Sequence, residues 1–177
     1  MTMFDFSEKD SCGVGFIASR NIPPTHGMTL KVLECLANLD HRGAKFADGT
    51  GDGAGVLTEI PFELIRAELE ELDIDHDSNK KIGIISCFFD PKNVDESIEL
   101  INNELQLFEI KQLYWRKVPT DKQILGTLAR ESKPSIYQGI VSAENESTKK
   151  IKKKLYLFRK TFERKIAEID FLNIHIN

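Results

Sequence analysis

Cys12 is the residue of this sequence best placed to act as a nucleophile. It opens an apolar run, Cys12 to Ser19, directly after a short polar leader, and two glycines follow it in Cys-Gly-Val-Gly. Small neighbours leave room for a carbonyl group beside the thiol, and a thiolate attacks carbonyl carbons readily. On the residues alone, an ordinary thiol is still the simpler interpretation.

The remaining cysteines and the histidines predict neither a disulfide framework nor a metal site. Cys35 and Cys87 lie in apolar runs, which predicts buried thiols that act as small hydrophobic side chains. Three cysteines cannot all pair with one another, and their spacing fits no metal-binding knuckle. The four histidines show no ligand spacing either. They are His26, His41, His76 and His175.

Two glycine-rich segments have nucleotide-binding alternatives. Gly13 to Ala18 matches the dinucleotide pattern G-x-G-x-x-A, but no strand precedes it and Pro23-Pro24 follows where a helix should open. Gly49 to Gly55 (GTGDGAG) lacks the Gly-Lys-Ser/Thr that completes a phosphate-binding loop. A tight turn is the preferred interpretation of this second segment, and a nucleotide titration would test the alternative.

Composition narrows the class of protein. The chain has 177 residues, 41% of them hydrophobic and 29% charged, with a net charge of −4. This is typical of a globular domain and gives no basic footprint for nucleic acid. No apolar stretch approaches the roughly 18–20 residues that cross a bilayer. Because the N-terminus lacks a signal-peptide pattern, we expect a cytoplasmic protein without a membrane or nucleic-acid partner.

Hydrophobic periodicity predicts alternating helices and strands. We expect helices over 29–39, 61–72, 94–107, 121–131 and 148–169. We expect strands over 12–19, 54–60, 81–89, 113–118, 135–141 and 171–176. The helix over 148–169 is basic and amphipathic, and a solvated face is favoured over an acidic partner. Alternation by itself would indicate a parallel doubly wound sheet.

Several motifs in order resemble the glutaminase domain, a class II glutamine amidotransferase, that opens the glutamate synthase large subunit. The strongest are Ser11 to Phe16 (SCGVGF), Leu39 to Ala44 (LDHRGA) and Thr50 to Gly55 (TGDGAG). Three later segments also look like that domain: Trp115 to Pro119, Leu125 to Arg130 and Lys154 to Lys160. The Thr-Gly-Asp-Gly-Ala-Gly motif favours glutamate synthase over other class II amidotransferases, which remain the nearest alternative.

The resemblance implies an α+β fold of the N-terminal nucleophile type, an αββα four-layer sandwich with two antiparallel sheets. It replaces the doubly wound interpretation. It also implies that residues 1–11 are a propeptide-like leader and that residues 12–177 are a partial amidotransferase domain. Because the sequence stops inside an apparent strand, we expect the domain to be incomplete at its C-terminus.

The resemblance assigns Cys12 as the catalytic residue and places Arg42, Gly43, Asp52 and Gly53 at the substrate. Removal of the leader would free the α-amine of Cys12, whose pKa of about 8 suits a general base, whereas an amide nitrogen is not basic. The thiolate would then attack the side-chain amide of L-glutamine and release ammonia. Arg42 would hold the site or the substrate through charge-assisted hydrogen bonds.

One departure concerns the oxyanion hole, which the family builds from an Asn-Gly pair. No Asn-Gly occurs in these 177 residues. Loss of one oxyanion donor costs about 10²–10³ in rate, so we expect little or no glutaminase activity from this chain alone. A non-catalytic relative of the same fold is the alternative.

The resemblance also implies groups that lie outside this chain. FMN and an iron–sulfur cluster are expected in the remainder of the full-length enzyme, and no cofactor is expected here. The implied partners are the other synthase domains and an electron donor, either a small subunit or ferredoxin.

Overall fold

The computed structural model describes residues 13–20, 25–51, 53–75, 81–143, 147–168 and 174–176. The chain divides into two compact units. The first contains residues up to Glu59 together with Asp121–Ser132, and the second contains Ile60–Thr120 and the residues from Lys133 onward. Each unit therefore joins segments that are far apart in the sequence.

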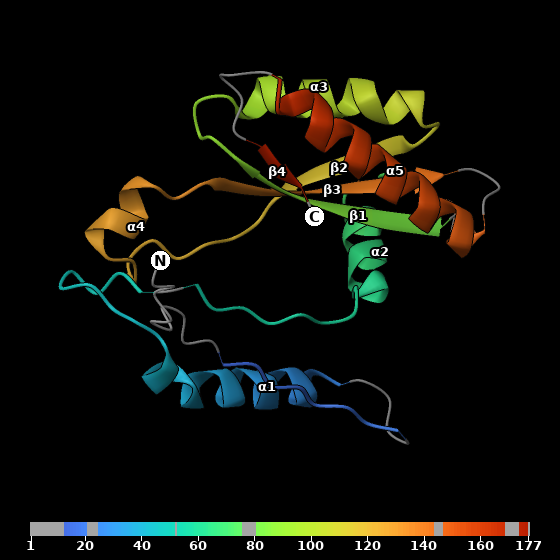
Figure 1. Cartoon of the computed structure of the whole chain (residues 1–177). Coiled ribbons are helices and arrows are strands. Elements are labelled where there is room, and N and C mark those ends of the chain that lie inside the picture. The colour runs from blue at the N-terminus through green and yellow to red at the C-terminus, as the bar shows by residue number, and fades with distance from the viewer. Residues whose placement is uncertain are drawn as a thin grey trace, which may run out of the picture. The chain divides into compact units, whose positions relative to one another are not determined.

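The second unit contains a four-stranded antiparallel sheet with the strand order β2-β3-β1-β4 (Figure 1). The strands are β1 (Lys81–Phe89), β2 (Lys111–Lys117), β3 (Ser135–Ala143) and β4 (Ile174–Ile176). β1 and β3 pair along their whole length, with Lys81 opposite Ala143 and Phe89 opposite Ser135. The antiparallel arrangement agrees with the α+β class expected from the resemblance, of which the described residues form one such sheet. The parallel doubly wound alternative is wrong for this sheet.

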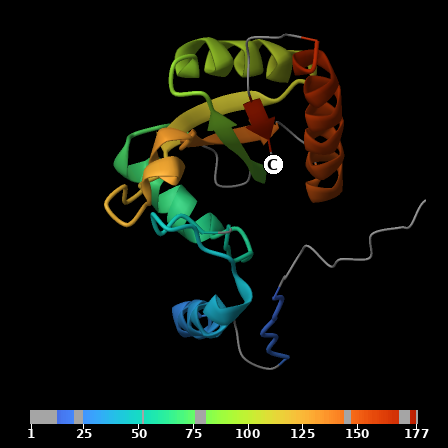
Figure 2. The ribbon, with the colours of Figure 1, turned by 60° about the vertical axis from the view of Figure 1, so that its left-hand side comes forward.

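Helices cover both faces of this sheet. They are α2 (Phe62–Glu71), α3 (Val94–Leu107) and α5 (Thr148–Ile166). α3 and α5 pack on one face, while α2 packs on the other (Figures 1 and 2). The alternation of side chains along β1 explains this division, because Ile85 and Cys87 join the core under α3 and α5 while Ile82 joins the core under α2.

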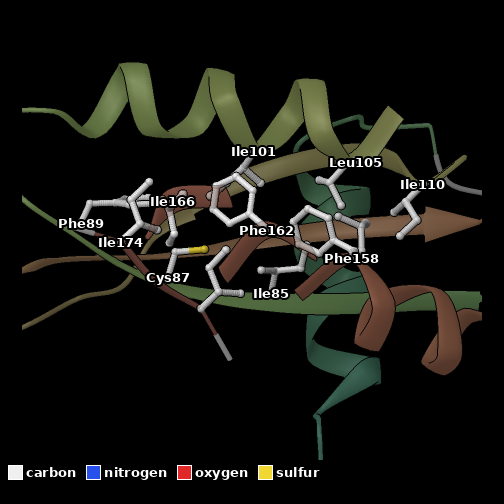
Figure 3. Close-up of a cluster of buried hydrophobic side chains, with 12 residues drawn as sticks. Ile85, Cys87, Phe89, Ile101, Leu105, Ile110, Phe158, Phe162, Ile166 and Ile174 are labelled. Atoms are coloured by element: carbon white, nitrogen blue, oxygen red, sulfur yellow. The ribbon is translucent and has the colours of Figure 1, made fainter. Parts of the chain in front are cut away.

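The larger core lies between β1, α3 and α5 (Figure 3). The rings of Phe158 and Phe162 stack with their centroids 5.7 Å apart. The apolar face predicted for the basic helix is confirmed, since its buried residues recur at helical spacing. They are Ile151, Phe158, Phe162 and Ile166. The helix ends three residues before its predicted end, and 171–173, predicted as part of the last strand, lie outside the described residues.

Trp115 packs across the sheet onto Gly139. The two residues are register partners on β2 and β3, and a Cβ at Gly139 would lie 2.9 Å from Cη2 of the indole. The indole Nε1 donates a hydrogen bond of 2.9 Å to Oδ1 of Asn102 in α3. The missing side chain at Gly139 therefore makes room for the indole, which ties α3 to the sheet.

The first unit contains α1 (His26–Asn38), the 3-10 helix η1 (Asp40–Arg42) and α4 (Thr127–Glu131). Two predicted strands are wrong where the structure describes them. Residues 13–19 and 53–60 form no strand, and Leu57 is fully exposed at 100%. A segment of alternating apolar residues forms a strand only where a neighbouring strand pairs with it. No such pairing is present along these two segments.

The predicted helix over 121–131 is also wrong in its first half. Asp121 does not cap a helix but accepts a hydrogen bond of 2.8 Å from the backbone N–H of Gln123, which makes a local turn. The helix begins only after Gly126. The start of α4 depends instead on a hydrogen bond from Leu128 to a distant residue, Asp48.

Candidate active site

The glycine-rich segment forms a tight hairpin. Lys45 and Gly51 make an antiparallel bridge, and the N–H of Phe46 donates to the carbonyl of Thr50 over 2.7 Å. Gly49 takes the positive φ of 82° that the turn requires, and its N–H donates to the carbonyl of Phe46. The backbone N–H groups of Phe46 and Gly49 are therefore bonded within the turn. In a phosphate-binding loop, such N–H groups would point at the ligand. This supports the tight-turn interpretation over a nucleotide-binding loop.

Two predicted substrate-binding glycines flank the hairpin in the sequence. Gly43 lies two residues before Lys45, and Gly53 lies two residues after Gly51. Lys45 and Gly51 face each other across the bridge, so each glycine lies two residues along the chain from the base of the hairpin. Asp52, predicted between them, lies outside the described residues.

Arg42 ends η1, which follows α1 after Leu39. The N–H of Arg42 donates to the carbonyl of Leu39 over 2.8 Å, and that of Gly43 donates to Asp40 over 3.2 Å. An ion pair of 2.7 Å joins Asp40 to Lys45 and lowers the pKa of the Asp40 carboxyl group. The ion pair thus connects η1, the helix that ends at Arg42, to Lys45 at the base of the hairpin.

Gly13 lies against Leu39. A Cβ at Gly13 would be 3.1 Å from both Cδ1 and Cδ2 of Leu39. Cys12, the predicted nucleophile, lies outside the described residues. The residue that follows it nevertheless packs beside the start of the Leu-Asp-His-Arg-Gly motif, so the structure brings two of the three strongest motifs together.

Asp48 is a structurally important residue that the sequence analysis did not single out. Its Oδ1 accepts the N–H of Thr50 over 3.0 Å, and its Oδ2 accepts the N–H of Leu128 over 3.0 Å. The hydrogen bond from the Leu128 backbone, followed by those from Thr50, lowers the pKa of Asp48 to about 2. An Asp-Gly-Thr turn is a local signal for the first bond. Nothing near Asp48 in the sequence indicates the second.

The other cysteines differ from each other. Cys87 is fully buried, as predicted, and burial raises the pKa of its thiol to about 12. Cys35 is exposed, so the prediction that it is buried is wrong. It belongs to α1, none of whose thirteen residues is buried, although its apolar residues recur at helical spacing.

The described part of the chain shows neither a metal-binding cluster nor a membrane-spanning helix. No group of three or more His, Cys, Asp or Glu side chains gathers there in a way that could hold a metal ion. No helix among the described residues has the length and apolar character to cross a bilayer.

Comparison with known protein families shows which family the chain belongs to. The family described as class-II glutamine amidotransferases matches residues 12–175, which is almost the whole chain. The chain belongs to the class-II glutamine amidotransferases. The match to this amidotransferase family begins at Cys12, the predicted nucleophile.

Relatives of this amidotransferase domain are found in glutamate synthases. The chain is 36% identical over 161 residues to the ferredoxin-dependent glutamate synthase of Pyropia yezoensis, a match that covers 90% of this chain and 10% of that protein. It is 34% identical over 167 residues to the NADH glutamate synthase of Saccharomyces cerevisiae, covering 86% of this chain and 8% of the relative. It is 33% identical over 165 residues to the large chain of the NADPH glutamate synthase of Bacillus subtilis, covering 88% and 10%.

The chain thus spans about a tenth of the length of the curated relatives that it matches. It is homologous to the N-terminal region of the glutamate synthase large chain.

Proposed function

We propose that this chain is the glutaminase part of a glutamate synthase, which hydrolyses L-glutamine to glutamate and ammonia for addition to 2-oxoglutarate. The observation that carries the proposal is the family match over residues 12–175, which begins at Cys12. The packing of Gly13 beside Leu39 supports it, because the nucleophile's neighbour then lies close to the motif that contains Arg42.

The proposed chemistry starts with removal of residues 1–11. The freed α-amine of Cys12 takes the proton of its own thiol, and the sulfur attacks the carbonyl carbon of the glutamine side chain. The C–N bond breaks as the amine returns the proton to the departing ammonia. Water then hydrolyses the thioester, which releases glutamate and restores the thiol.

Arg42, Gly43, Asp52 and Gly53 form the substrate-binding part of the proposal. Arg42 supplies a fixed positive charge with several N–H donors, which suits a carboxylate of the amino-acid substrate. Gly43 and Gly53 leave the base of one hairpin, and they present backbone without side chains. The pair would therefore line a pocket wall that a substrate approaches closely.

The proposed architecture is the four-layer αββα sandwich of N-terminal nucleophile enzymes. The antiparallel sheet with α3 and α5 on one face supports one sheet and its outer helix layer. The opposite face, which would meet the second sheet, is covered by α2 in the described residues. FMN, an iron–sulfur cluster and the site for 2-oxoglutarate are assigned to other parts of the full-length enzyme. The electron donor would be ferredoxin or a small subunit, since relatives are named for ferredoxin, NADH and NADPH.

Covalent labelling by a glutamine analogue tests the proposed nucleophile. The analogue carries a diazoketone in place of the amide, so the thiol sulfur displaces N₂ and the carbon takes up the thiol proton. This displacement does not rely on an Asn-Gly oxyanion hole. Peptide mass spectrometry gives the Cys12/Cys35 labelling ratio, defined as the labelling rate at Cys12 divided by that at Cys35. Exposed Cys35 serves as the internal reference.

We expect the Cys12/Cys35 labelling ratio to exceed about 10 with the analogue and to fall when L-glutamine is added. Iodoacetamide, which does not resemble glutamine, should show no comparable preference for Cys12 when glutamine is absent. Intact mass should show that the labelled chain has lost residues 1–11. A ratio near one for both reagents, without protection by glutamine, would contradict the proposed function.

A further inference from the structure

Asp48 joins the glycine-rich hairpin to a segment 80 residues further along the chain. Its Oδ2 accepts two hydrogen bonds, one of 3.0 Å from the N–H of Leu128 and one of 2.8 Å from the hydroxyl of Thr50. Its Oδ1 accepts the N–H of Thr50. One carboxylate therefore shapes the tip of the hairpin and also satisfies a free N–H in the first turn of α4.

Thr50 and Gly126 complete the same junction. The Thr50 hydroxyl oxygen accepts the N–H of Ala129 over 3.4 Å. A Cβ at Gly126 would collide with Oγ1 of Thr50 and lie 2.7 Å from its backbone nitrogen and 2.8 Å from the carbonyl oxygen of Asp48. Only a glycine lets the two backbones approach this closely, so both segments are fitted to each other.

The hairpin tip is joined to the base by one short turn, and Gly43 and Gly53 follow the base along the chain. Asp48 and Thr50 form the tip, while the bridge between Lys45 and Gly51 closes the base. Hydrogen bonds of 2.7 and 3.0 Å join Phe46 to Thr50 and to Gly49 within the turn. Because these bonds connect the tip to the base, we expect a displacement of the tip to move the base, from which the chain continues to Gly43 and Gly53.

We propose that Asp48 is a positioning residue of the glutaminase site, which anchors the hairpin to α4 and thereby fixes the segments that carry Gly43 and Gly53. The inference rests on the proposed function, because it concerns the geometry of that site. Asp48 need not touch the substrate. Its action is mechanical, through Thr50 and the hairpin, and a displacement of about 1 Å in a substrate-positioning segment can cost 10²-fold in rate.

Asp121 provides a matched control for the anchor. Its Oδ1 accepts the N–H of Gln123, two residues ahead, over 2.8 Å, just as Asp48 accepts the N–H of Thr50. Both are exposed aspartates in turns of the same unit. In the described part of the chain, only Asp48 of the two accepts a hydrogen bond from a distant backbone group. A comparison of the two variants therefore separates anchoring from turn formation.

The test measures the Cys12/Cys35 labelling ratio with the diazoketone analogue in three variants. Asp48→Ala should lower the ratio by about 10- to 100-fold, whereas Asp121→Ala should leave it within about twofold of the unsubstituted chain. Asp48→Asn keeps one oxygen acceptor for a backbone N–H and should give an intermediate ratio. Iodoacetamide should label Cys12 and Cys35 in the same proportion in all variants.

A substitution in the segment before α4 tests the same contact from the partner of Asp48 and Thr50. Gly126→Ala should lower the analogue ratio as Asp48→Ala does, because its methyl group would push Thr50 away. Hydrogen exchange should also quicken at Leu128, Phe46 and Thr50 in both variants. Protection of buried Cys87 from iodoacetamide shows that the second unit remains folded.

The outcomes separate the two proposals. If the unsubstituted chain shows no preference of the analogue for Cys12, both the proposed function and the positioning role are overturned. If it shows the preference and Asp48→Ala keeps it while exchange at Leu128 quickens, only the positioning role is overturned. A lower ratio in Asp48→Ala and Gly126→Ala, with Asp121→Ala unchanged, supports the anchor.

Discussion

The side chain of Leu39 lies against the backbone of Gly13, so that a methyl group at position 13 would be 3.1 Å from both methyl carbons of Leu39. This contact joins the segment that follows the proposed nucleophile to the start of η1, which ends at Arg42. The distance is shorter than a relaxed carbon–carbon contact of about 3.5–4.0 Å, so a side chain at position 13 requires the Leu39 side chain to shift.

We therefore expect Gly13→Ala to lower the Cys12/Cys35 labelling ratio with the glutamine analogue by about 3- to 10-fold, because the contact between Gly13 and Leu39 would be disturbed. Gly15→Ala is the matched control, since no atom lies within 4 Å of its added methyl group. Leu39→Ala combined with Gly13→Ala removes the clash and should restore part of the ratio. Equal ratios in the two glycine variants would show that the contact does not position the nucleophile.

Acid should release the anchor at Asp48. Hydrogen bonds from the Leu128 and Thr50 backbones lower its pKa from 3.8 to about 2. Because the folded-state pKa lies below the unfolded value, the carboxylate stabilises the anchored state fully above about pH 4, and this stabilisation is lost as the pH falls through 2.

In an NMR titration we expect the Leu128 amide resonance to move with a midpoint near the pKa of about 2. Asp48→Asn, which has no titrating group at this position, should abolish the movement. The Gly139 amide of β3 serves as a reference for the folded second unit. A midpoint near the ordinary value of 3.8 would contradict the hydrogen bonds to the carboxylate.

The two described cysteines should differ sharply in reactivity. Cys87 is fully buried and its thiol has a pKa of about 12, so only about 10⁻⁴ of it is ionised at pH 8. Cys35 is exposed on α1. Iodoacetamide should label Cys35 within minutes and leave Cys87 unmodified until urea unfolds the sheet. Labelling of Cys87 in the native chain at a rate close to that of Cys35 would contradict its place in the core.

Cys35 illustrates which features the sequence could not reveal. Strand β1 and helix α3 have their predicted bounds, because strong local patterns coincide with the pairing and burial that each element obtains. The apolar residues of α1 also recur at helical spacing, yet none of them is buried. Periodicity predicts the form of an element, whereas burial depends on which surface packs against it.

The candidate site shows the same limit. The motifs around Cys12, Arg42 and Asp52 were visible as short patterns, and the hairpin base follows from the glycines between them. The anchor was not visible, because the start of α4 depends on a carboxylate 80 residues earlier. A helix whose first turn is satisfied by a distant side chain carries no cap of its own, which is why the predicted start at Asp121 is wrong.

The buried carboxylate of Glu104 gives a test of stability in the second unit. Glu104 is 4% exposed in α3, and its Oε2 lies 2.6 Å from Nζ of Lys165 in α5. Lys165→Met leaves this carboxylate without its cation, and we expect the free energy of unfolding to fall by about 1–3 kcal/mol. Urea unfolding followed by circular dichroism measures the change.

Lys160→Met is the matched control, because its partner Glu163 is 38% exposed on the same helix. Its loss should be below about 0.5 kcal/mol. Glu104→Gln combined with Lys165→Met should recover part of the loss, since the amide does not carry the uncompensated charge. Similar losses for the two lysine variants would show that the contact between α3 and α5 depends on apolar packing alone.

The indole packed onto Gly139 gives the chain a built-in optical reporter. Trp115 is the single tryptophan of the sequence, and its partners Asn102, Phe89 and Gly139 all belong to the second unit. Its fluorescence emission therefore reports the unfolding of the second unit and does not report the unfolding of the first unit. Compared with far-ultraviolet circular dichroism, which senses the helices of both units, it shows whether the unit that carries the proposed site melts earlier than the sheet.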